Sequence, residues 1–242
     1  MEKFEKLEKF QVITASLLIG LAIIISTKMV ASNMSRNEIT VTGSAYEIVT
    51  SDTGSLNFEL NVKKATKQEA YAAAQSQMKI IDKYLKDKKI TNIDIKTSNG
   101  YYSYKQDPRT GYSTNVIDSY NYSQPYSISS DNAELIREIS TDITSLINQG
   151  VDISVFTPSY DYSKLPELKV KLLEKASNDA RNRAASMLKP THNSVGKIKA
   201  VRMGVYQITS VDSTNVSDSG INDTSTIEKK VTAVANVTFK IR

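Results

Sequence analysis

Serine and lysine residues in this sequence stand at spacings that active-site-serine acyl-transfer enzymes use. Ser76–Lys79 forms an S-x-x-K motif, and Ser130–Asn132 matches the second motif of the enzymes that react with penicillin. In that chemistry the serine attacks a carbonyl while a nearby base accepts its proton. The third motif, K-T-G, is absent, and S-x-x-K recurs at Ser186–Lys189 and Ser194–Lys197. A chain rich in serine and lysine produces this motif by chance, so a serine acyl-transfer enzyme is only a remote alternative.

Other catalytic or metal-binding chemistry has few residues available. The chain contains no cysteine, which excludes disulfides, thiol catalysis and cysteine-ligated metal centres. His192 is the only histidine, and its position just after Pro190 predicts a solvated loop residue. Acidic residues from Asp212 to Asp223 offer oxygen ligands but lack the spacing of a calcium loop. We therefore expect no cofactor, no metal and no enzymatic activity.

Tyrosines form the densest group of chemically distinctive side chains. Seven of the thirteen lie between Tyr101 and Tyr126, and five of these stand at even positions on two expected strands: Tyr102, Tyr104, Tyr120, Tyr122 and Tyr126. Strand side chains alternate between faces, so a hairpin that pairs even with even positions would gather all five on one surface. Tyrosine is enriched at protein interfaces, and its ring also stacks on sugars. The five residues are therefore a candidate interface with further copies of the chain, and cell-wall glycan is the alternative partner.

A simpler explanation of these tyrosines is that they suit any pleated surface half covered by its own helices. The hydrophobic pattern does predict such a surface: an α+β fold with a mainly antiparallel sheet, built from hairpins, and three helices packed on it. The expected strands are 39–42, 56–62, 93–104, 117–128, 151–156, 195–208 and 231–241. The helices are expected to begin near Thr66, Asp131 and Pro166 and to end near Lys89, Gly150 and Pro190.

The N-terminal region carries an uncharged apolar segment from Phe10 to Thr27. As a helix it would rise about 27 Å, close to the roughly 30 Å of a bilayer core, so it predicts one transmembrane helix. Its anchoring side chains are Phe10, Val12, Ile13, Leu17, Leu18, Ile19, Leu21, Ile23, Ile24 and Ile25. A cleaved secretory signal is the alternative, but the segment is long for one and Lys28 precedes the best cleavage position, Val30–Ser32.

Charge on either side of this segment predicts how the chain is oriented. Lys3, Lys6 and Lys9 precede it, against Lys28 and Arg36 after it, which favours a cytoplasmic N-terminus and an exported domain. We thus expect a single-pass protein of the cytoplasmic membrane. Its parts would be a short cytoplasmic amphipathic segment (1–10), the anchor (11–31), a linker (32–38) and one extracytoplasmic domain (39–242). The net charge of +5 is spread over predicted helix faces, so no nucleic-acid partner is expected.

Four stretches resemble the SIMPL-domain family, bacterial envelope proteins that were once grouped as a domain of unknown function and include a periplasmic immunogenic antigen. They are Ile39–Gly43, Ile90–Ser98, Gly150–Phe156, and Ala176–Ala184 followed by Val195–Ile198. The sequence departs from the family pattern at Ser51, where proline is usual, and at the insertion Pro190–Asn193. The resemblance covers roughly residues 39–242. It implies an exported or membrane-anchored protein, homo-oligomers that are ring-like in some members, and no agreed catalytic residues.

Overall fold

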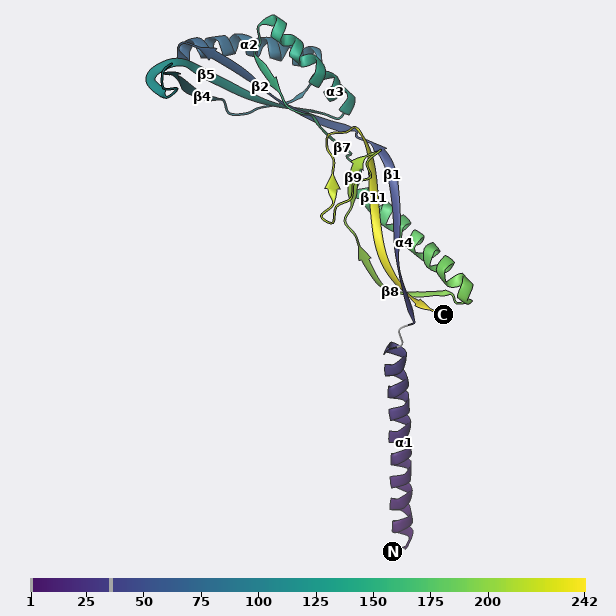
Figure 1. Cartoon of the computed structure of the whole chain (residues 1–242). Helices are drawn as coiled ribbons and strands as arrows, with labels where there is room; N and C mark the ends of the chain where they lie inside the picture. Colours follow the sequence, from purple (N-terminus) through teal and green to yellow (C-terminus); the bar gives the residue numbers. More distant parts are fainter. Residues whose placement is uncertain (1, 35–36) are drawn as a thin grey trace.

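The computed structural model describes residues 2–34 and 37–242. Within the first helix, side chains are described for Gln11 and for residues 13–30. The chain forms a long N-terminal helix followed by two mainly antiparallel β-sheets, each with helical structure packed on one face (Figure 1). Its α-helices are α1 (Glu2–Met34), α2 (Lys67–Asp87), α3 (Ala133–Asp142) and α4 (Leu165–Leu188). Two short 3-10 helices, η1 (Ile143–Gln149) and η2 (Lys189–Thr191), extend α3 and α4.

Sheet A brings together the beginning and the end of the domain. Strand β1 (Glu38–Thr50) pairs antiparallel with β11 (Glu228–Ile241) along its whole length, from Glu38 opposite Lys240 to Thr50 opposite Glu228. The other edge of β11 pairs with β8 (Val195–Met203) and β9 (Gln207–Ser210). The two-residue strand β10 (Ile221–Asn222) runs parallel to β9. The complete sheet A therefore needs strands from both the beginning and the end of residues 38–241.

Helix α4 packs on sheet A through its small side chains. Ala176, Ala180 and Ala184 are fully buried against Val237 and Phe239 of β11. A Cβ atom added to Gly43 of β1 would lie 2.1 Å from the carbonyl oxygen of Ala176, so the helix touches the strand backbone itself. The approach is held by Asp179, whose carboxylate accepts a 2.9 Å hydrogen bond from the backbone N–H of Ser44. The alanine spacing thus sets how closely helix and sheet pack.

Sheet B is built from a continuous part of the chain. Its strands are β2 (Thr53–Lys64), β3 (Asn92–Ile95), β4 (Asn99–Gln106), β5 (Ser113–Ser130), β6 (Ile153–Val155) and β7 (Ser159–Asp161). The long strand β5 pairs with β2, β3 and β4. Helices α2 and α3 lie side by side on one face of sheet B, where Lys88 at the end of α2 contacts both Glu138 (2.7 Å) and Asp142 (3.2 Å) of α3. Both helices therefore bury their apolar faces against the same sheet.

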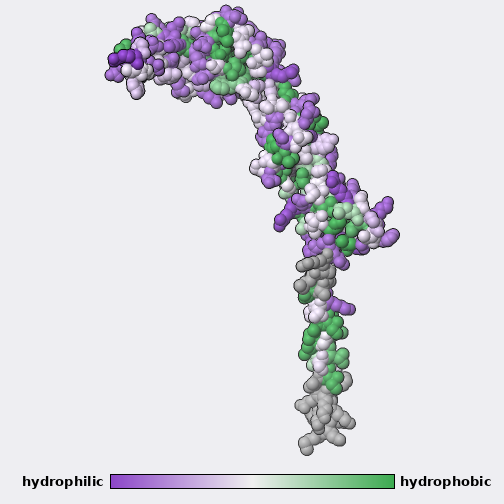
Figure 2. Space-filling model, in the orientation of Figure 1, coloured by the Kyte–Doolittle hydropathy of each residue, from purple (hydrophilic) through white to green (hydrophobic). Residues whose placement is uncertain are grey.

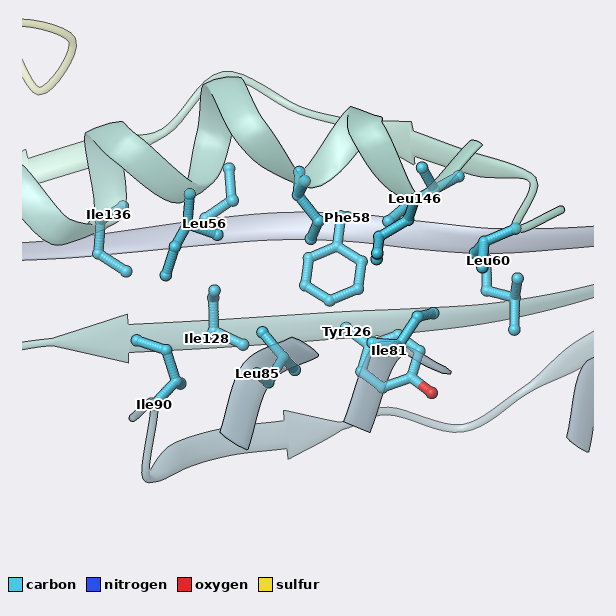
Figure 3. Packing of buried hydrophobic residues seen from close by; sticks show 14 of the residues in the cluster. Leu56, Phe58, Leu60, Ile81, Leu85, Ile90, Tyr126, Ile128, Ile136 and Leu146 are labelled. Atoms are coloured by element: carbon cyan, nitrogen blue, oxygen red, sulfur yellow. The ribbon is translucent and has the colours of Figure 1, made fainter. Parts of the chain in front are cut away.

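The largest hydrophobic core lies between sheet B and these two helices (Figure 3). Alternate residues of β2 point into it, among them Leu56, Phe58 and Leu60, which are fully buried. They pack against Ile81 and Leu85 of α2 and against residues of α3. Strand side chains alternate between faces and helix side chains return to one face every 3.6 residues, so each element presents one apolar face to this core. Sheet A has its own smaller clusters under α4, so each sheet has a separate core.

The structure confirms an α+β fold dominated by antiparallel sheet, with an apolar helix at the N-terminus. Thr66 and Glu69 form the expected capping box of α2, and Gly150 takes the left-handed conformation (φ 82°) that ends η1. The expectation of one sheet bearing three helices is corrected, because α2 and α3 cover sheet B while α4 covers sheet A. The expected strands 93–104 and 195–208 are each two strands.

Two adjacent strands in the sequence belong to different sheets. β1 and β2 are joined through Ser51 and Asp52, yet β1 pairs with β11 and β2 with β5. The backbone N–H of Ser51 donates to the carbonyl of Ile227, whereas that of Asp52 donates to the carbonyl of Asp161. Ser51 thus bonds toward sheet A and Asp52 toward sheet B, so the chain changes sheets between neighbouring residues.

Helix α1 contains a segment, Ile13–Val30, that is long and apolar enough to cross a membrane. None of it is buried against the rest of the protein, and Figure 2 shows its apolar surface standing apart from the two sheets. The expected anchor residues from residue 13 onward are all exposed: Ile13, Leu17, Leu18, Ile19, Leu21, Ile23, Ile24 and Ile25. The side chains of Phe10 and Val12 lie outside the described residues.

Candidate functional site

The candidate site is the tyrosine-rich hairpin of β4 and β5, with the pocket beside it. The hairpin turns at residues 107–112, where the N–H of Gly111 donates to the carbonyl of Asp107 (2.8 Å) and the N–H of Asp107 donates to that of Tyr112 (2.9 Å). Residues of the two strands pair even with even at Tyr102 and Tyr120. Beyond Ser103 the register shifts, so that Tyr104 lies opposite Ile117.

The five predicted tyrosines divide into buried and exposed members. Tyr126 is only 1% exposed and stacks on Phe58 in the core of sheet B. Tyr120 is also buried, and Tyr122 is half-buried against Tyr71 of α2, with ring centroids 6.1 Å apart. Only Tyr102 (43% exposed) and Tyr104 (48% exposed) present large ring areas to the outside. The five tyrosines therefore do not form one exposed surface. Tyr102 and Tyr104 form the exposed part, and the packed rings of Tyr120 and Tyr122 lie behind them.

Further apolar side chains surround the exposed pair. Tyr101, Tyr112, Val116 and Ile117 of the same hairpin are exposed. β4 pairs with β5 alone among the described strands, so its outer edge presents free backbone hydrogen-bonding groups. The charged residues of the hairpin are Lys105, Asp107, Arg109 and Asp118, and Asp118 pairs with Lys63 of β2 at 3.2 Å. This hairpin arm therefore combines aromatic surface with an open strand edge.

A pocket of about 620 Å³ opens between the hairpin and the start of α2. Its aromatic walls are Tyr71, Tyr120 and Tyr122, and its polar groups come from Lys67, Gln68 and Asn99. The lack of a side chain at Gly100 leaves room for the Tyr120 hydroxyl, because a Cβ atom at this position would lie 2.0 Å from its oxygen. The Tyr102 ring meets the Tyr120 ring edge to face at 4.9 Å. Aromatic rings beside amide and hydroxyl groups are the combination that holds sugars.

Several groups behind this arm, on α2, α3 and β5, have shifted pKa values. Hydrogen bonds from Lys88 and then Tyr84 hold the pKa of Asp142 below its usual value. Burial, followed by the hydrogen bond to Asp142, raises the pKa of Tyr84. Burial also raises the pKa of Tyr126 to about 12, with smaller contributions from Asp82 and Tyr122. The Tyr126 hydroxyl makes no hydrogen bond within the part of the chain that the structure describes.

The residues of the acyl-transfer motifs have structural roles. The Ser76 hydroxyl lies on the exposed side of α2 and donates to the carbonyl of Ala72 in the same helix. Asn132 is the N-cap of α3 and accepts from the N–H of Leu135, while the Ser130 hydroxyl accepts from the N–H of Asn132. Among the described residues, these hydrogen bonds join Ser76 neither to Lys79 nor to the Ser130–Asn132 segment. The structure thus supplies no assembled serine site in the part of the chain that it describes.

His192 and the acidic loop also have local explanations. His192 is an exposed residue in the left-handed conformation (φ 58°) that closes η2. In the loop, the Asp223 carboxylate accepts hydrogen bonds from Ser225 and Thr226. Within residues 2–34 and 37–242, no group of three or more His, Asp or Glu side chains could hold a metal ion.

Sequence reasoning missed the residues that complete the pocket. Lys67, Gln68 and Asn99 were not expected to join the tyrosines, because they come from a helix start and from a break between two strands. The signal for that break was Asn99-Gly100, a dipeptide typical of turns, since a glycine inside a strand pattern often marks a close approach. Only the pairing of β4 with β5 places the break beside Tyr120 and Tyr122.

Comparison with known protein families gives a match over most of the chain. The family model described as "SIMPL: Protein of unknown function (DUF541)" matches residues 39–239, which include both sheets and the three helices packed on them. No curated protein matches the sequence.

Proposed function

This chain belongs to the SIMPL family, and we propose that it is a membrane-anchored, non-enzymatic protein of the cell envelope whose SIMPL domain assembles with further copies of itself into a ring-like scaffold. Helix α1 would remain in the cytoplasmic membrane with its N-terminus inside and the domain outside. The observation that carries the proposal is the exposed aromatic arm, with Tyr102 and Tyr104 on an open strand edge.

Two physical arguments support assembly through this arm. Free strand edges in soluble proteins are normally short, charged or covered, and β4 carries only Lys105 among its residues as a formal charge. A second copy of the chain supplies the missing cover. In addition, an anchor confines every copy to the plane of the membrane, which raises the effective concentration of copies around one another. Weak lateral contacts then suffice.

The test is the mass of the full-length protein after extraction in detergent, for the wild type and for Tyr102→Ser/Tyr104→Ser. Both side chains are exposed in the single chain, so the variant should fold while the assembly dissociates. Truncating a tyrosine at the centre of an interface costs on the order of 2 kcal/mol. Tyr46→Ser is the matched control, because Tyr46 is exposed (65%) on sheet A, outside the arm. A monomeric wild type, or an unchanged mass for the double variant, would contradict assembly through the arm.

A glycan-binding module is the second candidate, and the pocket beside the hairpin favours it. Tyr71 and Tyr122 offer ring surface for a sugar, and Gln68 and Asn99 offer amide hydrogen bonds. Gln68→Ala/Asn99→Ala should then lose binding to purified peptidoglycan while keeping the wild-type mass. If the tyrosine variant retains its mass but loses peptidoglycan binding, glycan recognition replaces assembly as the function of the hairpin.

A further inference from the structure

One end of sheet A, where the chain arrives from α1, gathers several chain segments. Glu38 begins β1 and lies opposite Lys240 near the end of β11. Ser194 and Arg242 exchange two backbone hydrogen bonds, with N···O distances of 2.8 and 2.9 Å. Helix α4 ends here, and Figure 1 shows the C-terminus at the end of the sheet nearest α1. We call this part, residues 37–38, 181–199 and 240–242, the basal end.

The basal end carries positive charge that is not neutralised within the protein. Arg181, Lys189, Lys197 and Lys240 are exposed, and none has a carboxylate within salt-bridge distance in the described part of the chain. The acidic side chain of this region, Glu38, is already paired with Lys199. A cation is favoured at the end of a helix, which accounts for Lys189 alone. Lys197 and Lys240 lie on strands, so helix polarity does not explain the cluster.

A pocket of about 590 Å³ lies in this basic surface. Most of its lining residues carry hydrogen-bond donors, and none of the described ones is a carboxylate; the donors are Arg181, Asn182, Ser186, Lys189, His192, Asn193 and Ser194. His192 lines it from a left-handed backbone conformation (φ 58°), which residues other than glycine adopt rarely. Guanidinium, ammonium and hydroxyl groups around one hollow are the donors that bind phosphate oxygens.

The chain length fixes this surface near a bilayer if α1 spans one. The apolar segment of α1 ends at Val30 and the helix at Met34, one further turn that rises about 6 Å. From Met34 to Glu38 the chain can extend at most about 14 Å. The polar headgroup layer is itself several ångströms thick on each side of the bilayer core, and charges act over about 8 Å at physiological salt. The chain therefore holds the basal end within about 20 Å of the end of the apolar segment, which allows it to reach the lipid headgroups.

We propose that the basal end binds anionic phospholipid headgroups of the leaflet in which α1 ends, with a headgroup phosphate in the pocket beside α4. Charge complementarity and the short connection to α1 select a lipid surface as the occupant. The inference rests on the proposed anchoring by α1. Its consequence is orientation: sheet A stands with its basal end on the membrane, and sheet B is held away from it.

The chain has no tryptophan, so a single introduced tryptophan can report contact. Full-length Ile198→Trp places it on exposed β8 within the basal end. The protein is reconstituted in vesicles of phosphatidylcholine, with or without phosphatidylglycerol, that contain phosphatidylcholine bearing a nitroxide on its headgroup. We expect stronger quenching in the phosphatidylglycerol vesicles. Adding Lys189→Gln, Lys197→Gln and Lys240→Gln should weaken this quenching. The ratio of headgroup-bound to headgroup-free orientations of the domain is expected to fall at least about tenfold.

Controls separate this inference from the anchoring on which it rests. Lys79→Gln, Lys83→Gln and Lys86→Gln remove the same charge from α2 and should leave the quenching unchanged. Leu21→Trp reports insertion of α1, using a nitroxide on the acyl chain. If Leu21→Trp is not quenched, the anchoring has failed. If it is quenched but Ile198→Trp responds equally in both lipids, or ignores the loss of the three basal lysines, the headgroup proposal is overturned.

Discussion

The ring of Tyr126 lies flat on the ring of Phe58, with centroids 4.9 Å apart and 8° between the planes, in the core of sheet B. The stacking is favourable, but the Tyr126 hydroxyl is buried without a hydrogen-bond partner among the described residues. A buried polar group left unpaired costs about 1–3 kcal/mol. Tyr126→Phe should therefore raise the free energy of unfolding at neutral pH, by about 1 kcal/mol in urea titrations.

The same residue predicts an alkaline transition. Burial raises the pKa of Tyr126 to about 12, from about 10 in the unfolded chain. The free energy of unfolding is thus unaffected by Tyr126 ionisation below a pH of about 10. It falls as the pH rises from there toward the folded-state pKa, because the unfolded chain releases the Tyr126 proton first. Tyr126→Phe should lose less stability than the wild type over this range, because Tyr84 still has a raised pKa. Tyr112→Phe, at an exposed position, should behave as the wild type; equal alkaline sensitivity of all three proteins would contradict the assignment.

Gly43→Ala should push α4 away from sheet A, because the added methyl group has no space between the strand and the helix. An added Cβ would lie 2.1 Å from the Ala176 oxygen and 2.4 Å from the Ala180 nitrogen, both in the helix backbone. Gly43→Ala should destabilise the domain by about 3 kcal/mol, measured by urea unfolding. Ser44→Ala is the control, because the Ser44 side chain is exposed and its backbone bond to Asp179 survives. A Gly43→Ala protein with wild-type stability would show that α4 is not seated as described.

Asp52 should make stability depend on acid pH. Its carboxylate accepts from the Ser163 hydroxyl (2.6 Å) and N–H (2.7 Å), and these bonds, the hydroxyl first, hold its pKa below the usual value. The lowered pKa means that the contribution is present above a pH of about 4 and disappears as the pH falls through the folded-state pKa. Asp52→Asn should lose about 1 kcal/mol at neutral pH and differ little from the wild type near a pH of about 2. A difference that persists unchanged in acid would point to another cause; exposed Asp94→Asn is the control.

Gly100→Ala should disturb the pocket without unfolding sheet B. The new methyl group would lie 2.0 Å from the Tyr120 hydroxyl oxygen, so the Tyr120 ring must move, at a cost of about 1–3 kcal/mol. Aromatic proton shifts of Tyr120 and Tyr102 should change in NMR spectra, since their ring centroids are 4.9 Å apart. The shifts of Phe58 and Tyr126 should stay, because their stack is buried in the core. Changes spread over both pairs would mean that the pocket and core are not separable.

Local signals in the sequence predicted the elements well. The pair Thr66 and Glu69 starts α2, and Gly150 ends η1, because capping depends on neighbours a few residues away. The assignment of strands to two sheets could not be obtained this way. β1 and β2 have similar alternating patterns, and only pairing with β11 and β5, far along the chain, sends them to different sheets.

The tyrosines show the same limit at the candidate site. Their even spacing left the register of the hairpin open and could not separate buried from exposed rings; the structure pairs Tyr102 with Tyr120. That difference comes from α2, which covers Tyr126 and half-covers Tyr122 but leaves Tyr102 and Tyr104 open. The register shift after Ser103 likewise depends on how β4 pairs with β5, which no local sequence pattern predicts.

Sheet B should fold without sheet A. All of its strands and every buried residue of its core lie between Thr53 and Asp161. Ile227, just before β11, is the one partly buried hydrophobic residue that packs on this core from outside that range among the described residues. A fragment of residues 51–163 is therefore expected to give a dispersed NMR spectrum and a cooperative urea transition.

A disordered fragment would show instead that the two sheets are obligatory partners. The same fragment carrying Leu56→Ala, which opens a cavity at a fully buried site, should be unfolded and serves as the negative control.

The pairing of β1 with β11 dictates an order of events during synthesis. β1 emerges from the ribosome early, but its only partner among the described strands is completed near residue 241. Sheet B can form before sheet A is fully synthesised. Until β11 is available, the 13 residues of β1 stay unpaired. The waiting strand carries Tyr46 and Ile48, apolar groups that a chaperone would recognise. The synthesis of β11 therefore determines when β1 can pair along its length.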